Sequence, residues 1–555
     1  MVRKFVMAFK LGIGGKTKVE ADVIVLGCTL PGMVAAHKLM TKFGDTMDIV
    51  LLDLSAPAAK HLSAANVAFC EVPHDDSDSE SEYIRRDRDD YTARQILDNV
   101  ARLYLLQYAK DFKVPLPDAI IYPQLEDKVL PLHKLFQYPN GSQVKFLNNV
   151  HDFEYLNLFE KFELNQYQTF LDKSMMELFQ TNSIDLAEER RILQYYDQTT
   201  MENNICATLL FSNSREIMRI IVRLVCGAPA NSVSLLFYLH QCYRTSSTKN
   251  HLDGLNTSFR EKLLGHCRKR LSSKLHKSVA NITLKAKSIK GIRTYSQQVI
   301  LETRKGETTY ICNLLAMALR PDDMHDIQLE GKLLTEQTRK ITKDMIPGRG
   351  KKFNIQYEDN FWSRQGFTGD IFSMRGPIIW AMEIPKLSTT GSSGRYSGLI
   401  GYLRDDDAEC KEAVIEQLVN MFGSDAAEPV SYRETPIVDV YVPRCGDYAA
   451  LRFLMSEGSP KFLEWGALDI FGEGDVAAAL EAGHVAYLHL MGCLRPQAQT
   501  FDDVIACEWP TFLSEGQLSV WMSQMNLYSS IKITMFASAL CIGVHLLRSY
   551  LRKQA

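Results

Sequence analysis

The sequence predicts an α/β fold, and three observations lead to this prediction. An apolar run within ADVIVLG ends at Gly27, and after Gly32 apolar residues recur at helical spacing, as in a strand, a tight turn and a helix. A second apolar run, DIVLLD, ends at Asp53. Between residues 279 and 314, short alternating runs indicate a β-meander whose last strand heads inward. A strand, helix and strand in this order are typical of a Rossmann-like domain.

The turn in the first unit has the spacing of a phosphate-binding loop, with one substitution. In such loops the first glycine makes the turn, the second lets the backbone approach a pyrophosphate, and the third packs helix on strand. Gly27 and Gly32 occupy the first and third positions, but Thr29 occupies the second. Asp53 stands where an acid would hold a ribose hydroxyl. Two interpretations remain open, a nucleotide site and an ordinary βαβ packing unit.

Length and composition limit the classes of protein to consider. With 555 residues the chain is too long for one core, and about two or three folding units are expected. A hydrophobic content of 46% is typical of a globular protein, and a net charge of -3 gives no reason to expect nucleic acid as a partner. The 12 cysteines are scattered without metal-ligand spacing, so no metal site is predicted and a reducing compartment is favoured.

Two charged segments carry no catalytic motif. Residues 1–20 hold several Lys and Arg and no acid before Glu20, which fits an organelle-targeting segment or a plain basic tail. Residues 74–90 combine an acidic block with arginines and are most simply a solvated loop.

Helices are predicted where apolar residues recur at helical spacing, in residues 91–112 and 155–170. Two long helices, REIMRIIVRLVCG and NSVSLLFYLHQCY, are predicted between residues 212 and 243, and their apolar character on most sides predicts that they are buried. At the C-terminus, residues 533–547 are mostly apolar and have basic flanks. They favour a transmembrane tail anchor over residues 531–555, and the alternative is a buried C-terminal helix.

The strand-like segment FNIQY follows a basic turn, and its side chains alternate between two faces. The apolar face comprises Phe353, Ile355 and Tyr357. The polar face comprises Lys352, Asn354 and Gln356. This polar face is either exposed to solvent or the polar wall of a cavity.

The order of these segments resembles that of the flavin-containing monoamine oxidases over most of the chain. The motif FWSRQGFTG is similar to the FW-x-x-x-G-F-x-G segment of flavin amine oxidases, and it puts Lys352 in the place of the family's flavin-side lysine. YVPRC, which ends at Cys445, matches the family's Y-x-x-x-C, whose cysteine bonds to the flavin 8α carbon. GDVAAALEAG, from Gly474 to Gly483, resembles the family's last flavin-contacting helix.

This resemblance implies FAD as cofactor, attached through Cys445 or held without a covalent bond. The cofactor-binding residues that it implies are Gly27, Thr29, Gly32, Asp53, Cys445, Gly474 and Gly483. Lys352 would be the catalytic residue, holding a water against flavin N5. The reaction implied is oxidation of an amine to an imine with release of hydrogen peroxide.

The chain departs from the family where cofactor and substrate would lie. Gly446 and Asp475 stand at the two substrate-side tyrosines of the family, so the aromatic cage for the amine is absent. Two family glycines before Cys445 are replaced by Pro443 and Arg444. These substitutions support a second hypothesis, a catalytically inactive amine-oxidase-fold protein that acts as a membrane-anchored binding or scaffold protein.

The resemblance also predicts the domain organisation. A discontinuous FAD-binding-like domain would comprise residues 21–95, 206–320 and 440–495, and an α+β substrate domain would comprise residues 96–205 and 321–439. A helical region at residues 496–530 would precede the tail anchor. The expected location is the mitochondrial outer membrane with the bulk of the chain facing the cytosol, and a homodimer is an expected assembly.

Overall fold

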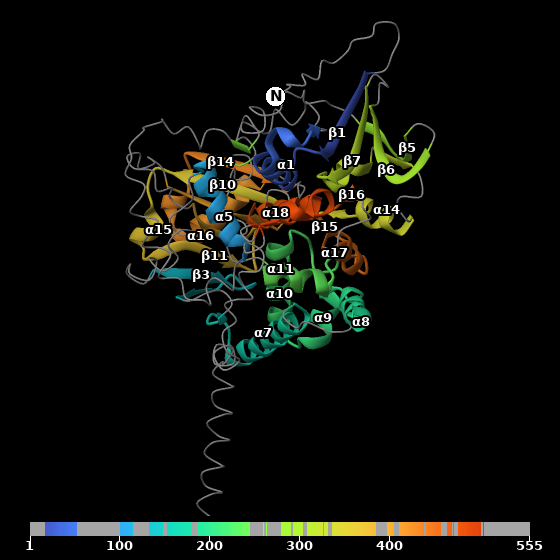
Figure 1. Ribbon diagram of the computed structural model, residues 1–555. Helices are drawn as coiled ribbons and strands as arrows, with labels where there is room; N and C mark the ends of the chain where they lie inside the picture. Colours follow the sequence, from blue (N-terminus) through green and yellow to red (C-terminus); the bar gives the residue numbers. More distant parts are fainter. Residues whose placement is uncertain are drawn as a thin grey trace, which may run out of the picture. The chain divides into compact units, whose positions relative to one another are not determined.

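The computed structural model describes most of the chain between residues 17 and 500. The described ranges are 17–52, 100–114, 132–147, 152–179, 186–244, 279–289, 292–303, 308–325, 327–330, 336–384, 397–404, 410–437, 440–456, 463–468 and 476–500, together with residues 259, 262, 263, 470 and 503. Nearly all of them belong to one compact unit, made of residues 1–75 and 101–500. Figure 1 shows the two large sheets of this unit.

The first sheet is built on β1 (Thr17–Leu26), which runs parallel to both β2 (Ile49–Leu52) and β7 (Thr308–Met317). Residues 23–26 of β1 are completely buried, as expected for a strand that is covered on both faces. The strand begins earlier than its apolar run predicts, because its polar first half also pairs with β7, Thr17 opposite Thr308. The predicted strand, turn and helix at the start of the chain are therefore confirmed.

The predicted meander is also confirmed, and its last strand pairs with β1. β5 (Val279–Ile289), β6 (Ile292–Thr303) and β7 pair antiparallel in sequence order. The sheet order is β2-β1-β7-β6-β5-β8, where β8 is Gln328–Glu330, and β16 (Leu463–Glu464) also pairs with β7. Leu26 is paired with Met317, so β1 and β7 end at the same edge.

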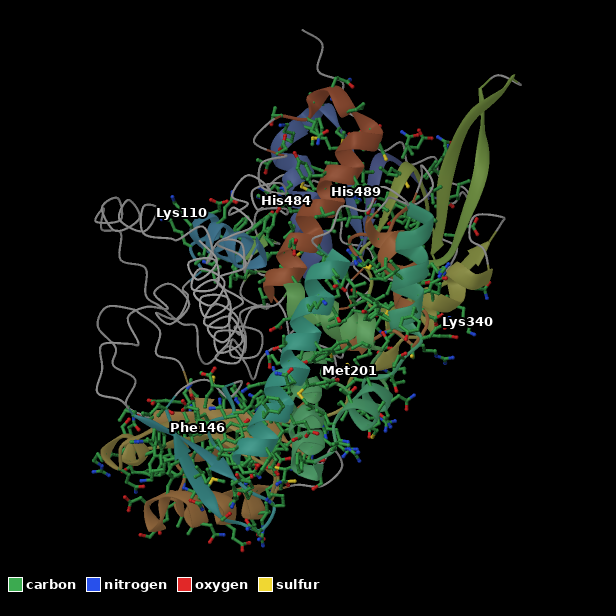
Figure 2. All side chains as sticks on the ribbon, turned by 90° about the horizontal axis from the view of Figure 1, so that it is seen from below. Lys110, Phe146, Met201, Lys340, His484 and His489 are labelled. Atoms are coloured by element: carbon green, nitrogen blue, oxygen red, sulfur yellow. The ribbon has the colours of Figure 1, made fainter. Side chains whose placement is uncertain are left out.

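Two helices meet at this edge. α1 (Leu30–Phe43) follows β1, and α18 (Val476–Leu494) packs against it, as Figure 1 shows. α5 (Val100–Phe112) confirms the described part of the helix predicted for residues 91–112. Its Tyr104 ring lies 5.1 Å from the ring of His484 on α18, the helix on which Figure 2 marks His484 and His489.

The second sheet has the order β14-β10-β13-β12-β11-β3-β4. Its strands are β14 (Ser431–Pro436), β10 (Lys351–Tyr357), β13 (Ser397–Leu403), β12 (Ile378–Glu383), β11 (Phe367–Ser373), β3 (His133–Gln137) and β4 (Gln143–Phe146). The predicted alternation of β10 is confirmed. Phe353, Ile355 and Tyr357 are buried in a core shared with α16 (Lys411–Phe422), and the alternate residues are half-buried.

The FWSRQGFTG motif serves the core of this second sheet. It forms α15 (Phe361–Arg364) and the start of β11. Trp362 is fully buried, and its indole N–H donates to Glu383 (3.3 Å). Gly369 has a φ of +87°, and a Cβ there would lie 2.9 Å from the Leu399 side chain. The residues that carry the family resemblance here are therefore explained by packing and turn geometry.

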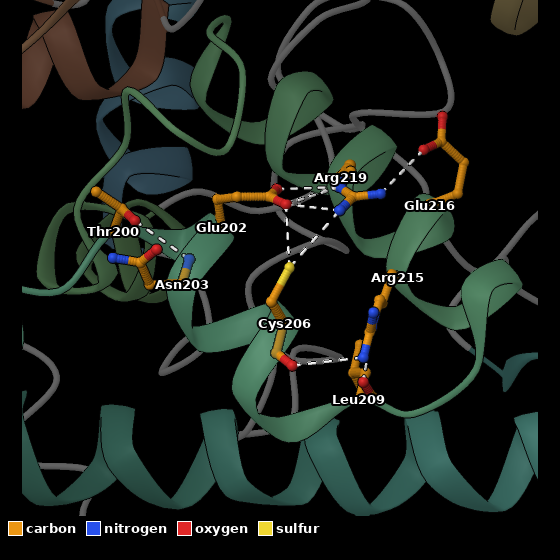
Figure 3. A network of polar contacts seen from close by, with 8 residues as sticks. All are labelled: Thr200, Glu202, Asn203, Cys206, Leu209, Arg215, Glu216 and Arg219. Carbon is orange, nitrogen blue, oxygen red and sulfur yellow. Dashed lines mark hydrogen bonds and ion pairs between the residues drawn. The ribbon is translucent and has the colours of Figure 1, made fainter.

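In the sequence, a group of helices lies between β4 and β5. They are α7 (Leu158–Phe179), α8 (Leu186–Asp197), α9 (Met201–Thr208), α10 (Ser212–Cys226) and α11 (Leu235–Arg244). α7 begins later than predicted and extends well past residue 170. The two long helices predicted between residues 212 and 243 are confirmed, and residues 215–227 of the first are all buried or half-buried, as predicted. Charged residues of α10 have partners outside the helix: Arg219 binds Glu202 of α9 (2.9 Å from Nε to Oε2), as Figure 3 shows, and Glu216 binds Arg404 (3.0 Å).

Short elements complete the described fold. They are α13 (Pro321–His325), α14 (Glu336–Lys343), β9 (Ile346–Pro347), β15 (Tyr441–Val442), α17 (Tyr448–Ser456) and the 3-10 turns η1 (Gly44–Thr46), η6 (Ser424–Ala426) and η7 (Pro496–Ala498). β15 pairs with β9 and leads through the turn that carries Cys445 into α17.

No helix within the described ranges is long and apolar enough to cross a membrane. The predicted tail anchor at residues 531–555, the basic segment up to residue 16 and the charged block at residues 74–90 all lie outside those ranges. The predicted domain boundaries stay predictions.

Candidate functional site

The turn after β1 is closed by the end of β7. The N–H of Gly27 donates to the carbonyl of Leu52 (2.7 Å), and the φ of Gly27 is +110°. A Cβ on Gly27 would lie 1.9 Å from the Ala318 carbonyl oxygen, and one on Gly32 would lie 2.3 Å from the Ala318 Cβ. Both glycines are therefore needed because Ala318 approaches the turn so closely.

Thr29 takes the place of the middle glycine without backbone strain. Its φ of -69° and ψ of 161° are available to any residue. The hydroxyl donates to the Ala318 carbonyl (2.9 Å) and makes no cap bond to α1. The first turn of α1 also contains no acidic residue, so the helix itself places no carboxylate at its positive end. This helix start fits the phosphate end of a dinucleotide.

α18 lies directly against the same helix start. A Cβ on Gly483 would lie 2.5 Å from the Pro31 carbonyl oxygen, so glycine allows α18 to cross the first turn of α1. Gly27, Thr29, Gly32 and Gly483 are thus gathered around one helix terminus. Asp53, Gly474 and Asp475 fall outside the described residues, and their roles stay predictions.

Lys352 lies on the polar face of β10, beside aromatic side chains of the same sheet. It is opposite Tyr402 of β13 and Thr435 of β14 in the strand register. Its Nζ lies 5.7 Å from the centre of the Tyr402 ring, and the ring of Trp380 lies 5.9 Å from that of Tyr402. The half-buried ammonium group is therefore held over an aromatic wall.

Cys445 points towards α8. Its thiol donates to the backbone carbonyl of Asp197, the last residue of α8 (3.0 Å). Burial raises the pKa of this thiol, and the nearby carboxylates of Asp197 and Asp447 raise the pKa further. The β9–β15 pair links the segment before Cys445 to the segment before Lys352.

Gly446, which the family resemblance places at a substrate-side aromatic position, has open space beside it among the described residues. Its φ is +95°, and among the described residues no atom lies within 4 Å of a Cβ placed there. Arg444 does not fill this space, because its Nε donates to the carbonyl of Asp344 (3.0 Å) after α14.

Three residues that matter here are absent from the sequence prediction. Ala318 shapes the turn, and a small residue at the end of a predicted strand was its only signal. Tyr402 faces Lys352 across a strand pair. Asp197 contacts residues about 250 positions away, so no local pattern could identify it.

Known proteins with a similar sequence or structure identify the type of fold. No family model matches the sequence. The chain is 22% identical over 250 residues to a probable flavin-containing monoamine oxidase A of Dictyostelium discoideum, covering 43% of this chain and 53% of that protein. It therefore spans about half the length of this curated relative.

Solved structures agree with that match. Putrescine oxidase, wild type and bound to putrescine, has a TM-score of 0.56 and 12% identity, covering 84% of this chain and 98% of that one. Cyclohexylamine oxidase from Brevibacterium oxydans has a TM-score of 0.56 and 16% identity, with the same coverage. The predicted amine-oxidase-type α/β fold is confirmed.

Proposed function

Since the chain shares the fold of the flavin amine oxidases and is a divergent relative of them, we propose that it is an FAD-dependent oxidoreductase acting on a small-molecule amine. The observation that carries this proposal is the turn after β1. It keeps the first and third glycines around Ala318 and leaves the start of α1 without a side-chain cap.

The described residues suit the phosphate end of FAD. The backbone of Gly32 and the start of α1 would face the pyrophosphate, and Thr29 turns its hydroxyl towards β7. When bound, FAD would supply the redox chemistry, taking two electrons from an amine to leave an imine and passing them to dioxygen as hydrogen peroxide. Asp53, Gly474 and Asp475 would complete the site according to the family resemblance.

Lys352 is the residue for which we propose a catalytic role. Tyr402 fixes the position of its ammonium group, which can donate hydrogen bonds to a water at the reacting end of the site. Trp380 and Tyr402 would exclude bulk water on this side. They do not restore the family's cage, since the position of Gly446 is open.

A catalytically inactive relative is the second candidate function. The observation that favours it is the same open space at Gly446, because no described side chain lies within 4 Å of a Cβ placed there. Such a protein would keep the fold and act as a membrane-anchored binding or scaffold protein.

Anaerobic mixing with a panel of primary, secondary and aromatic amines separates the two candidates. An oxidase bleaches its flavin with at least one amine, whereas the flavin of an inactive relative that binds FAD is bleached by none.

We expect Lys352→Met to slow turnover by roughly a hundredfold. Lys351→Met is the matched control, because Lys351 lies on the same strand but pairs with Glu434 (3.0 Å). Equal slowing in both variants would remove the proposed role of Lys352.

We also propose that residues 531–555 form a tail anchor and hold the protein in the mitochondrial outer membrane. Deleting these residues is expected to release the protein from the membrane pellet into the soluble fraction. Retention in the pellet would show that another segment binds the membrane. A homodimer is proposed from the resemblance alone, and light scattering of the detergent-free truncated chain measures it.

A further inference from the structure

Contacts of Asp197 hold the turn between β15 and α17 against the end of α8. Its side chain is fully buried, and one carboxylate oxygen accepts the N–H of Ala449 in the first turn of α17 (2.9 Å). Burial raises the pKa of this carboxyl, and hydrogen bonds from Ala449, Ser234, Tyr448 and Gly446 act to lower it. The Ala449 N–H therefore ties the first turn of α17 to the end of α8 through this carboxylate.

The backbone of Asp197 also binds Cys445. The thiol donates to the Asp197 carbonyl oxygen at 3.0 Å. On the other side of the turn, Arg444 is fixed by the backbone carbonyl of Asp344 and by an ion pair with its carboxylate (3.8 Å). The turn is thus held from α8 and from the end of α14, and the sulfur faces protein backbone.

The charges around the sulfur oppose the formation of a thiolate. Burial and the two carboxylates of Asp197 and Asp447 all raise the pKa of Cys445. The neighbouring cation, Arg444, is bound to Asp344 instead, although a cation beside the sulfur is what makes a cysteine nucleophilic. A thiolate is the form of cysteine that attacks carbon.

We propose that Asp197 is a positioning residue that holds the Cys445–Gly446 turn on α8 and keeps Cys445 as a hydrogen-bond donor, so that FAD bound to this chain is not attached through Cys445. The first half of this proposal depends only on the contacts of the turn. The second half rests on the proposed function.

Thiol labelling tests the first half without any cofactor. Cys445 of the purified full chain is alkylated with iodoacetamide across a pH series, and its peptide is quantified by mass spectrometry. In the native protein we expect a pH midpoint above the ordinary value of 9.0. Asp197→Asn removes the charge and keeps one acceptor oxygen. We expect it to speed labelling of Cys445 about threefold to tenfold at pH 8 and to leave the exposed Cys206 unchanged.

Asp447→Asn is the matched control. It removes the other carboxylate near the sulfur, so labelling should also become faster. Because Asp447 does not accept from the N–H of Ala449, hydrogen exchange at that amide should stay slow in Asp447→Asn and become fast in Asp197→Ala, which leaves that N–H without its acceptor oxygen. A native midpoint at or below 9.0, unchanged labelling in Asp197→Asn, or unchanged exchange in Asp197→Ala would overturn the role of Asp197. If Asp197→Ala does not fold, labelling of Asp197→Asn still decides.

Acid precipitation tests the second half. Flavin released entirely into the supernatant is the expected result, and a yellow pellet whose colour is lost in Cys445→Ala would overturn it. A preparation that binds no flavin at all contradicts the proposed function instead, and the labelling results still decide the role of Asp197.

Discussion

Thr29 shows at the scale of one residue how a turn with the spacing of a phosphate-binding loop can lose its middle glycine and keep its shape. The backbone there is extended, so a side chain causes no strain, and the Ala318 carbonyl satisfies the hydroxyl. The substitution therefore leaves the turn itself intact, and under the proposed function its effect would fall on a ligand that approaches α1. The fold can persist while the affinity for a dinucleotide falls.

Restoring the glycine should separate these two effects. Thr29→Gly removes one buried hydrogen bond, and we expect unfolding to become easier by about 1 kcal/mol. Removing the Cβ lets a pyrophosphate come closer to the start of α1, so we expect tighter binding of FAD, measured by fluorescence titration of the purified chain. Thr29→Val, which loses the hydroxyl but keeps the bulk, is the control. Equal FAD affinity in both variants would contradict the steric explanation.

Gly27 is required by contact as well as by its backbone conformation. In Gly27→Ala the new Cβ meets the Ala318 carbonyl oxygen at 1.9 Å, and we expect a loss of roughly 2–4 kcal/mol in the free energy of unfolding. Gly44 also has a positive φ, of +53°, but no described atom lies within 4 Å of a Cβ there. Gly44→Ala should therefore cost only about 1 kcal/mol in the same urea titration. Similar losses would show that Ala318 moves aside freely.

At the scale of elements, the contact between α1 and α18 depends on one small residue. We expect Gly483→Ala to destabilise the protein by about 1–3 kcal/mol, because its Cβ would meet the Pro31 carbonyl oxygen at 2.5 Å. Gly492 lies on the same helix, and no described atom lies within 4 Å of a Cβ there, so Gly492→Ala should stabilise by roughly 0.5–1 kcal/mol. Thermal unfolding of both variants measures the difference. Two shifts of the same sign would refute close packing at Gly483.

The pairing of α9 with α10 should depend on pH. The hydrogen bond from Arg219 lowers the pKa of the Glu202 carboxyl below its ordinary value of 4.5. A carboxyl whose pKa is lowered by folding adds stability above its unfolded pKa and loses it as the pH falls through the folded pKa. Native protein should therefore exceed Glu202→Gln in stability at pH 7, by less than about 1 kcal/mol because the pair is partly exposed. This advantage should shrink below pH 4.5, and an advantage that is constant from pH 7 to 3 would exclude the pair as its source.

For the whole molecule, the parts that local patterns could predict are those with a regular period. The apolar run of β1, the meander and the alternation along β10 all depend on neighbours in the sequence, and each is confirmed. The glycine spacing of the first turn was visible for the same reason.

The parts that local patterns could not predict depend on contacts between distant segments. Thr29 contacts Ala318, 289 positions away in the sequence, and Cys445 contacts Asp197, 248 positions away, and neither pair has a sequence signature. The ion pairs of α10 with Glu202 and Arg404 were also not predicted, because the pattern of apolar residues does not show which charges find partners. For the candidate site, the sequence therefore predicts the glycines and Lys352. It does not predict Ala318 and Tyr402, which contact them.

The most direct test of the central claim is the stoichiometry of FAD in the purified full-length chain. Absorbance in the flavin band, before and after titration with added FAD, gives the number of cofactor molecules bound per chain. The fold and the uncapped start of α1 predict that binding saturates at about one FAD per chain. A folded chain that is colourless as purified and takes up no added FAD would contradict the claim.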